Sequence, residues 1–401
     1  MSFEALGLSE NALNAIRKKG FSEPTDIQRE VIPRLLEGGK NIIGQSQTGT
    51  GKTASFALPL IEMINEEDRY VQAIILTPTR ELALQVADEI KSLRGRKKIK
   101  VFAVYGGQPI GPQIRILNRG VHIVVGTPGR VLDHMRRGTL KLNGIRYFIL
   151  DEADRMLDMG FIDDIKIILR ETPEYKRILM FSATMPAEIL RLAEHYMRNY
   201  ELIKTSEDEL VPSLVEHEYI EVVPARKLSL LKDILDDDFY GIVFCQTKRE
   251  TRELAGKLIC SGYPAEALNG DMTQKAREST FWRFKKRKIK ILVATDVAAR
   301  GIDIQDITHV VNYSLPQNPD GYIHRIGRTG RAGKKGKAIT LIMPGEYKKL
   351  RYIANVAGIR INKSELQGDY RPEKKNYGCY AEYRKHGERS YSPKKRKYRR
   401  Y

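Results

Sequence analysis

The sequence predicts an α/β protein with two parallel-sheet domains in tandem. The chain has 401 residues, which is long for one domain and sufficient for two hydrophobic cores. Short segments rich in Val and Ile recur along it, each followed by turn residues or a helical pattern, which is typical of a parallel sheet covered by helices. The alternation stops at the acidic segment "TSEDELVPS" (205–213) and then begins again. We interpret this segment as a short linker.

The first domain is predicted to span residues 1–204, with a helix over "RELALQVADEIKSL" (80–93). Ligands of such sheets bind at the carboxyl ends of the strands, and polar clusters follow the strands here. The predicted strands are "NIIG" (41–44), "AIILTPT" (73–79), "KVFAVYGG" (100–107), "HIVVGTP" (122–128), "YFILDEA" (147–153) and "RILMFSAT" (177–184).

The second domain is predicted to span residues 214–366 and to have the same architecture. Its strands are expected at "EYIEVV" (218–223), "GIVFCQT" (241–247), "KILVATD" (290–296), "HVVNYS" (309–314) and "KAITLIM" (337–343).

The final residues, 367–401, predict a disordered basic tail. Residues 369–401 contain 12 Lys or Arg and 4 Asp or Glu, a net charge of +8 (12 − 4), together with seven tyrosines. Such a segment has too little aliphatic surface to offset the entropy lost on ordering.

The net charge of the whole chain, +19, favours a polyanionic partner. Nucleic acid is the first candidate and an anionic membrane surface the second. No apolar run approaches the roughly 18 residues that span a bilayer, and the N-terminus lacks the layout of a signal peptide. Three cysteines are an odd and sparse set, so we expect a reducing, intracellular location and no structural metal.

The segment "SQTGTGKT" (46–53) follows a predicted strand and precedes a helical pattern, as a phosphate-binding loop does. Its glycines allow backbone N–H groups to surround phosphate at a helix N-terminus. Lys52 would reach the β- and γ-phosphates, and the Thr53 hydroxyl would bind Mg²⁺. Ser46 stands where the motif usually has its first Gly, so the motif alone is a weaker indication of nucleotide binding. The predicted nucleotide-binding residues are Ser46, Gln47, Thr48, Gly49, Thr50, Gly51, Lys52 and Thr53.

Acidic residues end the predicted strand in "YFILDEAD" (147–154). An Asp at this place commonly holds the Mg²⁺ that bridges the phosphates, which predicts Asp151 as a metal ligand. Glu152 is predicted to polarise the attacking water. Asp154 is expected to make structural or interdomain hydrogen bonds.

The segment "HRIGRTGRAG" (324–333) contains three arginines and no acid. The first domain shows no obvious arginine that could stabilise the charge on a transferring phosphoryl group. Arg328 and Arg331 of the second domain could do so if the domains close, as arginine fingers do in other NTPases. A basic surface loop is the alternative that the spacing leaves open.

Residues 1–365 resemble the DEAD-box family of ATP-dependent RNA helicases, in superfamily 2. About a dozen motifs occur in the family's order, including "SQTGTGKT", "DEAD" (151–154), "SAT" (182–184), "ATDVAARGID" (294–303) and "HRIGRTGR" (324–331). The resemblance implies two tandem RecA-like domains, with ATP and Mg²⁺ as cofactors.

Further motifs imply the roles of individual residues. "GFSEPTDIQ" (20–28) is similar to the family's Q motif, which implies that Gln28 reads the adenine edge and Phe21 stacks near the ring. Asp26 stands where many members have Pro. Asp303 would serve the ATP-bound closed state, and His324 would help couple "SAT" to the arginine motif.

The resemblance also implies contacts to the RNA backbone and a coupling element. In the family, "SAT" links the ATP state to unwinding, which implies coupling roles for Ser182 and Thr184 together with Asp154. The implied RNA contacts are Pro78, Thr79, Arg80, Gly107, Thr127 and Arg130 in the first domain, and Gln246, Arg249 and Thr295 in the second.

The predicted function is therefore that of a cytoplasmic ATP-dependent RNA helicase. It would bind RNA without sequence preference, hydrolyse ATP when RNA closes the two domains, and locally unwind short duplexes or remodel RNA–protein complexes. An ATP-gated RNA clamp with little unwinding shares every motif, and a DNA remodeller of superfamily 2 is less favoured. Ribosomal and decay ribonucleoproteins are possible partners. The Tyr- and Lys/Arg-rich tail would bind RNA as an accessory, or be a solvated extension.

Overall fold

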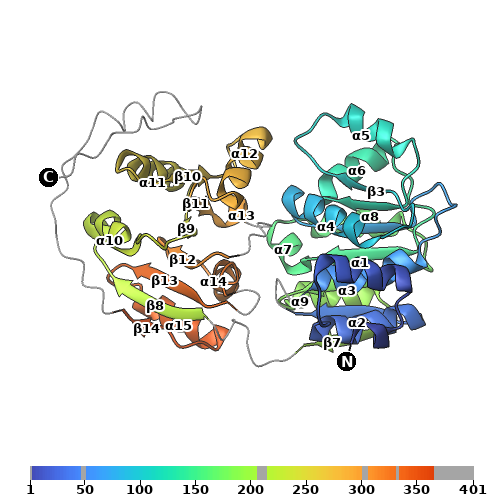
Figure 1. The fold of residues 1–401 in the computed structure, drawn as a ribbon, viewed down its shortest axis with the longest axis horizontal. Helices are drawn as coiled ribbons and strands as arrows, with labels where there is room; N and C mark the ends of the chain where they lie inside the picture. Colours follow the sequence, from blue (N-terminus) through green and yellow to red (C-terminus); the bar gives the residue numbers. More distant parts are fainter. Residues whose placement is uncertain (1, 47–50, 206–214, 300–305, 331–333, 365–401) are drawn as a thin grey trace. The chain divides into compact units, whose positions relative to one another are not determined.

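The fold was analysed in a computed structural model, which describes residues 2–46, 51–205, 215–299, 306–330 and 334–364 (Figure 1). The chain divides into two compact units, Met1–Asp208 and Glu209–Tyr401. Each unit contains one seven-stranded sheet, and every strand pair is parallel. The predicted class, two tandem parallel-sheet domains, is confirmed. The predicted tail (367–401) and most of the predicted linker lie outside the described residues.

The sheet of the first unit has the strand order β3-β4-β2-β5-β6-β1-β7. Six of its strands lie where the sequence predicts them, and the seventh was missed because "YELIK" alternates polar and apolar residues and lacks a Val-rich run. The strands are β1 (Asn41–Gln45), β2 (Ala73–Leu76), β3 (Val101–Val104), β4 (Ile123–Gly126), β5 (Tyr147–Asp151), β6 (Arg177–Ser182) and β7 (Tyr200–Lys204).

Helices cover both faces of this sheet. One core cluster joins the sheet to α1–α4, and a second joins it to α5–α9. Helix α4 has the predicted bounds, because the Thr79 hydroxyl accepts a hydrogen bond from the Leu82 N–H and so caps its first turn. The helices are α1 (Glu10–Lys19), α2 (Asp26–Glu37), α3 (Lys52–Met63), α4 (Arg80–Leu93), α5 (Ile110–Leu117), α6 (Pro128–Arg136), α7 (Ala153–Asp158), α8 (Ile162–Arg170) and α9 (Ala187–Tyr196), preceded by the 3₁₀ turn η1 (Phe3–Leu6).

The sheet of the second unit has the order β10-β11-β9-β12-β13-β8-β14. Numbered from its own first strand, this order is identical to that of the first unit. Two strands were not predicted: β10 is spelled "AEAL", which favours a helix, and β14 has only two residues. The strands are β8 (Val215–Glu221), β9 (Gly241–Cys245), β10 (Ala265–Leu268), β11 (Ile291–Thr295), β12 (His309–Asn312), β13 (Gly336–Ile342) and β14 (Asn362–Lys363).

The second sheet is likewise covered on both faces. Helices α10 and α11 pack on one face, and α12–α15 pack on the other in two smaller clusters. The helices are α10 (Lys227–Ile234), α11 (Lys248–Cys260), α12 (Gln274–Lys285), α13 (Asp296–Ala299), α14 (Pro319–Ile326) and α15 (Tyr347–Ala357), with the 3₁₀ turn η2 (Pro224–Arg226) before α10. Among the described residues, no helix is long and apolar enough to cross a membrane.

Candidate functional site

The predicted phosphate loop lies between β1 and α3. Gly51 precedes the helix with φ of 84°, a conformation that favours glycine. An added Cβ would also come within 2.3 Å of Gln28 Nε2, so the position requires a residue without a side chain. Four predicted nucleotide-binding residues, Gln47, Thr48, Gly49 and Thr50, lie outside the described residues.

Lys52 opens α3 and is buried, with 6% of its surface exposed. Its ammonium donates a hydrogen bond of 2.8 Å to the backbone oxygen of Ser46 across the loop. Burial lowers the pKa of Lys52, while the nearby carboxylate of Asp151 opposes that shift. A buried cation beside the open N–H groups of a helix N-terminus is suited to an anion such as phosphate.

Asp151 is the last residue of β5 and is also buried. Burial raises the pKa of this carboxyl to about 7, and Lys52 opposes the increase. A divalent cation would favour the charged form. Asp151 and the Thr53 hydroxyl supply the oxygen donors that Mg²⁺ prefers, so the residues fit the ion. No group of three or more His, Cys, Asp or Glu forms a metal cluster in the described part of the chain, so an ion here would complete its shell with phosphate and water.

Glu152 follows Asp151 in the left-handed region, with φ of 56°, and is buried. A residue with a Cβ adopts this conformation at a cost of about 1 kcal/mol, and such outliers cluster at functional sites. Its Oε2 lies 3.1 Å from Nη1 of Arg155, whose side chain is 1% exposed. Sequence reasoning missed Arg155, because nothing in its position signals that the arginine points inward to the acid.

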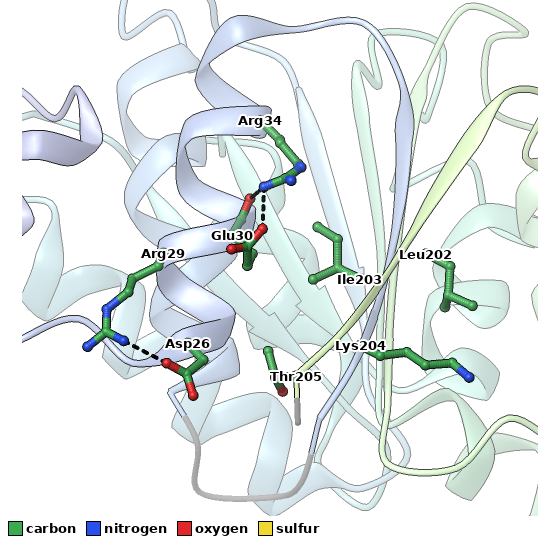
Figure 2. A pocket seen from close by; sticks show the side chains of 8 residues that line it. All are labelled: Asp26, Arg29, Glu30, Arg34, Leu202, Ile203, Lys204 and Thr205. Atoms are coloured by element: carbon green, nitrogen blue, oxygen red, sulfur yellow. Dashed lines mark hydrogen bonds and ion pairs between the residues drawn. The ribbon is translucent and has the colours of Figure 1, made fainter. Parts of the chain in front are cut away.

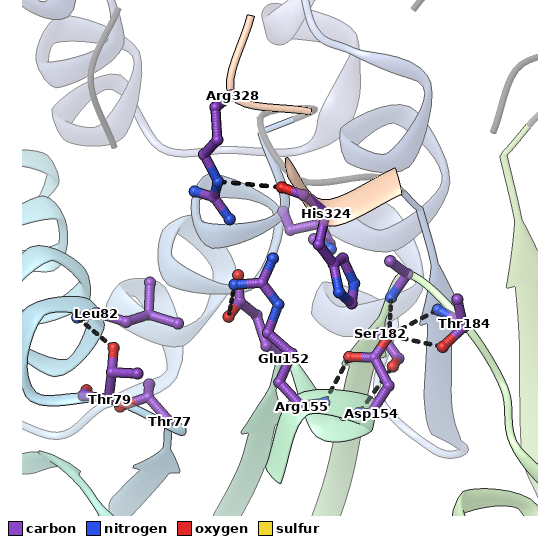
Figure 3. Close-up of polar contacts among 12 residues, drawn as sticks. Thr77, Thr79, Leu82, Glu152, Asp154, Arg155, Ser182, Thr184, His324 and Arg328 are labelled. Atoms are coloured by element: carbon purple, nitrogen blue, oxygen red, sulfur yellow. Dashed lines mark hydrogen bonds and ion pairs between the residues drawn. The ribbon is translucent and has the colours of Figure 1, made fainter. Parts of the chain in front are cut away.

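Asp154 connects the acidic motif to the end of β6 (Figure 3). Its Oδ2 accepts hydrogen bonds from Ala183 N (3.2 Å), Thr184 N (2.8 Å) and Thr184 Oγ1 (2.9 Å). Its own N–H donates to Ser182 Oγ at 3.1 Å. The structure therefore brings together the three residues predicted to couple ATP state to unwinding: Asp154 donates to Ser182 and accepts from Thr184.

Gln28 is tied to the phosphate loop by its side-chain amide. Its Nε2 donates to Gly51 O at 3.1 Å, and its Oε1 accepts from Thr25 N at 3.0 Å, which completes a capping box on α2. The side chain predicted to contact adenine is therefore also hydrogen-bonded to the phosphate loop. Phe21 is half-buried and packs against the core of the first unit.

A hollow of about 430 Å³ lies beside the same helix, between α2 and the edge strand β7 (Figure 2). It is rimmed by two ion pairs, Asp26–Arg29 and Glu30–Arg34, both at 2.7 Å. None of the predicted site residues lines it, and we assign no nucleotide to it. Its remaining lining residues are Leu202, Ile203, Lys204 and Thr205.

The RNA contacts implied for the first unit follow β2, β3 and β4, at the same edge of the sheet as Asp151. Arg80 lies over Gly107, where an added Cβ would come within 1.9 Å of the guanidinium. Arg130 donates to Gln108 O at 3.0 Å, so its side chain is held against the same loop. Thr79, Pro78 and Thr127 occupy the strand-to-helix turns.

In the second unit, the implied RNA contacts lie at the carboxyl ends of β9 and β11. Gln246 and Arg249 are exposed, whereas Thr295 is 8% exposed. The Gln246 N–H donates to Glu250 Oε2 at 2.9 Å, and Arg249 pairs with Glu253 at 2.8 Å. Both side chains are exposed at this edge of the sheet.

The arginines of "HRIGRTGRAG" have different structural positions. Arg325 is 2% exposed and its guanidinium contacts Asp296 through two bonds of 2.6 and 2.8 Å, so it is an internal anchor. Its acidic partner, Asp296, lies 29 residues earlier in the sequence, so the segment 324–333 itself contains no acidic residue. Arg328 follows α14, and its Nε donates to His324 O at 3.3 Å. Arg331 and Asp303 lie outside the described residues.

The first unit has the features of the nucleotide-binding domain of a P-loop NTPase. Its sheet is parallel, the buried Lys52 begins α3, and the buried Asp151 ends β5. The family model "DEAD/DEAH box helicase" matches residues 25–192, and "Helicase conserved C-terminal domain" matches residues 226–333. The chain belongs to the DEAD-box family of ATP-dependent RNA helicases, and it is an enzyme of that class.

Relatives at high identity support this assignment. A probable ATP-dependent RNA helicase of Methanocaldococcus jannaschii is 56% identical over 364 residues, which are 90% of this chain and 98% of that protein. The DEAD-box ATP-dependent RNA helicase CshA of Bacillus subtilis is 49% identical over 88% of this chain and 72% of its own length.

Solved structures agree. A DEAD box protein of Methanococcus jannaschii has 55% identity and a TM-score of 0.55, over 91% of this chain and 99% of that one. Dbp5 of S. cerevisiae bound to RNA and ADP BeF3 has 34% identity and a TM-score of 0.84, over 90% and 95%.

Proposed function

We propose that the chain hydrolyses ATP when RNA closes its two units, and that it thereby separates short RNA duplexes and remodels RNA–protein complexes. The observation that carries the proposal is the Asp154 network. It links the acidic strand end, where Asp151 and Glu152 lie, to the Ser182–Thr184 turn through four hydrogen bonds. A change at the phosphate site can therefore reach the end of β6 through fixed bonds.

In this mechanism Lys52 would bind the β- and γ-phosphates of ATP, and Thr53 and Asp151 would hold Mg²⁺. The ion, when bound, neutralises charge on the phosphate oxygens. Glu152 would accept a hydrogen bond from the attacking water and take its proton as the water oxygen bonds to the γ-phosphorus, while the bond from that phosphorus to the bridging oxygen breaks and ADP leaves. Gln28 positions the adenine while its amide stays bonded to Gly51.

Arg328 and Arg331 supply positive charge to the γ-phosphoryl group once the units close. His324 and Asp303 support that closed state. ATP bound to the first unit alone would lack this charge, so hydrolysis would wait for RNA. The proposal is supported by Dbp5, which is a structural relative bound to RNA and ADP BeF3.

RNA would run along the carboxyl edges of the two sheets, bound through its sugar-phosphate backbone and 2′-OH groups. The residues in contact would be those already placed there in each unit. We propose a cytoplasmic location, with ribosomal and decay ribonucleoproteins as candidate targets.

The experiment that tests the proposal is steady-state ATPase of the purified chain with Mg²⁺, alone, with single-stranded RNA and with DNA of the same sequence. Stimulation by RNA and not by DNA is the expected result. Equal stimulation by both would make the substrate assignment wrong. A strand-displacement assay on a short duplex then separates a helicase from an ATP-gated clamp, because a clamp would show RNA-stimulated ATPase without displacement.

Gly107→Ala should weaken RNA binding about tenfold or more and leave ATP binding unchanged. The new Cβ meets the Arg80 guanidinium, and φ of 76° is strained for alanine by about 1 kcal/mol, so both the turn and the arginine must move. Fluorescence anisotropy of a labelled single-stranded RNA measures the affinity. Gly111→Ala is the matched control, because nothing lies within 4 Å of its Cβ position. If the two variants bind RNA with equal affinity, Arg80 and Gly107 do not contribute to RNA binding.

A further inference from the structure

The C-terminal turn of α12 carries a dense basic cluster that no step of the mechanism uses. Between Trp282 and Lys290 the sequence "WRFKKRKIK" contains six Lys or Arg and no acid. Three of these have partners that explain them. Arg283 pairs with Glu266, Arg287 pairs with Asp306 at 3.8 Å, and Lys290 donates to Asp237 O at 2.6 Å.

The remaining three, Lys285, Lys286 and Lys288, are exposed at the surface of the second unit. Lys285 and Lys286 are three and four residues beyond Trp282, which places all three side chains on one helical face. The ammonium of Lys288 lies 4.5 Å from the centre of the Trp282 ring. Trp282, the single tryptophan of the chain, is half exposed, at 50%.

The backbone of this turn has a specific geometry. Lys288 N donates to Arg283 O at 2.9 Å, and Arg287 N donates to Phe284 O at 2.8 Å, as in a Schellman motif. Arg287 occupies the position that normally takes glycine, with φ of 54°. A cationic side chain has therefore been placed where the local conformation disfavours any side chain. Contacts of the Arg287 guanidinium with Asp306 and, at 4.7 Å, with the centre of the Tyr240 ring offset this cost.

The cluster is distant from the RNA contacts implied by the motifs. Residues 286–290 lead into the first residue of β11, whereas Thr295 ends that strand (Figure 1). Five residues of strand separate the two by about 13 Å. A polyanion bound at Trp282 would therefore lie at the amino edge of the second sheet, whereas Gln246 and Thr295 lie at its carboxyl edge.

We propose that Trp282, Lys285, Lys286 and Lys288 form a second RNA-binding surface, which engages single-stranded RNA without ATP. The lysines contact successive phosphates and the indole stacks on a base, the combination by which single strands are bound without sequence preference. Charge complementarity alone would admit an anionic membrane, but the half-exposed indole among the cations favours a nucleobase. The inference rests on the RNA binding proposed above.

Trp282 allows a direct test in the full-length chain, because its fluorescence comes from the proposed surface itself. Titration with a poly(U) oligonucleotide in the absence of nucleotide should change the tryptophan emission saturably, and added salt should reverse the change. Trp282→Ala, followed with labelled poly(U), should lose roughly 5- to 100-fold in affinity. If poly(U) leaves the emission of the wild-type chain unchanged, the proposal is overturned.

The second arm replaces Lys285, Lys286 and Lys288 together by Gln. Affinity for poly(U) should fall, and the slope of log affinity against log salt should decrease by about 2, because three phosphate contacts are lost. The matched control replaces Lys348, Lys349 and Arg351 by Gln, which removes the same charge from the exposed side of α15. Equal losses in the two variants would mean that only net charge matters, and would overturn the proposal.

Two further readouts separate this inference from the proposed function. Vesicles rich in phosphatidylserine should leave the emission of Trp282 unchanged; a vesicle response without a poly(U) response would assign the surface to membranes. If RNA stimulates the ATPase of the wild-type chain but the α12 variant binds RNA normally, the second surface is wrong and the helicase function stands. If RNA fails to stimulate the wild-type chain, the proposed function fails first.

Discussion

Replacement of Arg328 by Ala should lower the RNA-stimulated kcat by about 10³-fold or more, within the 10³–10⁵-fold range of arginine fingers in other NTPases. The side chain would stabilise negative charge that develops on the γ-phosphoryl oxygens only in the transition state, so the loss falls on kcat and not on ATP affinity. Steady-state ATPase with saturating RNA, together with equilibrium binding of a fluorescent ATP analogue, measures the two quantities separately.

Arg328→Lys is the matched control for charge. It keeps the positive charge but loses the planar fork that binds two oxygens, so it should recover only part of kcat. Thermal unfolding of both variants checks that the second unit remains folded, since Arg328 is buried and its Nε is bonded to His324 O. A normal kcat in the Ala variant would show that Arg328 takes no part in hydrolysis, and the arginine-finger assignment would be wrong.

Replacement of Glu152 by Gln should lower kcat by about 10²–10⁴-fold, while ATP still binds. The amide cannot accept the proton of the attacking water, whereas Lys52 and Asp151 keep their contacts with phosphate and metal. Single-turnover hydrolysis measured with RNA present tests the chemical step itself.

The same change has a second effect, which must be separated from the first. Arg155 is 1% exposed and 3.1 Å from Glu152, so the Gln variant leaves a buried guanidinium without its charge partner. Removal of one member of a buried pair costs about 3–5 kcal/mol of stability. The double variant Glu152→Gln with Arg155→Met removes both charges. It should regain thermal stability without regaining activity. Recovery of kcat along with stability would assign Glu152 a structural role alone.

The sequence predicts most of the fold because eleven of the strands are Val- and Ile-rich runs that end in polar turns. The sequence does not predict three strands: β7 is half-exposed, β10 is composed of helix-forming residues, and β14 has only two residues. Their strand conformation comes from pairing along the sheet, as when β10 pairs with β11, and no local pattern contains that information.

For the site, the motifs predict which residues are chemically active, but not how they are held. Gln28 bonds to Gly51, Asp154 to Thr184, and Arg325 to Asp296, and each pair is more than 20 residues apart. Such bonds depend on the order of strands in the sheet, so they could not be predicted from the spacing of residues. The left-handed conformation of Glu152 is equally invisible in sequence, because its residue type gives no reason to expect it.

The shared strand order of the two sheets has an evolutionary and a stoichiometric consequence. It is the pattern expected of an ancestral gene duplication, after which the halves diverged. In the first half, β1 leads into a glycine-rich phosphate loop. In the second, the corresponding strand β8 leads into "VVPARK" (222–227), which contains no glycine. Only the first half therefore carries a phosphate-loop sequence at this place, and we expect one ATP bound per chain, which equilibrium titration with a nucleotide analogue would measure.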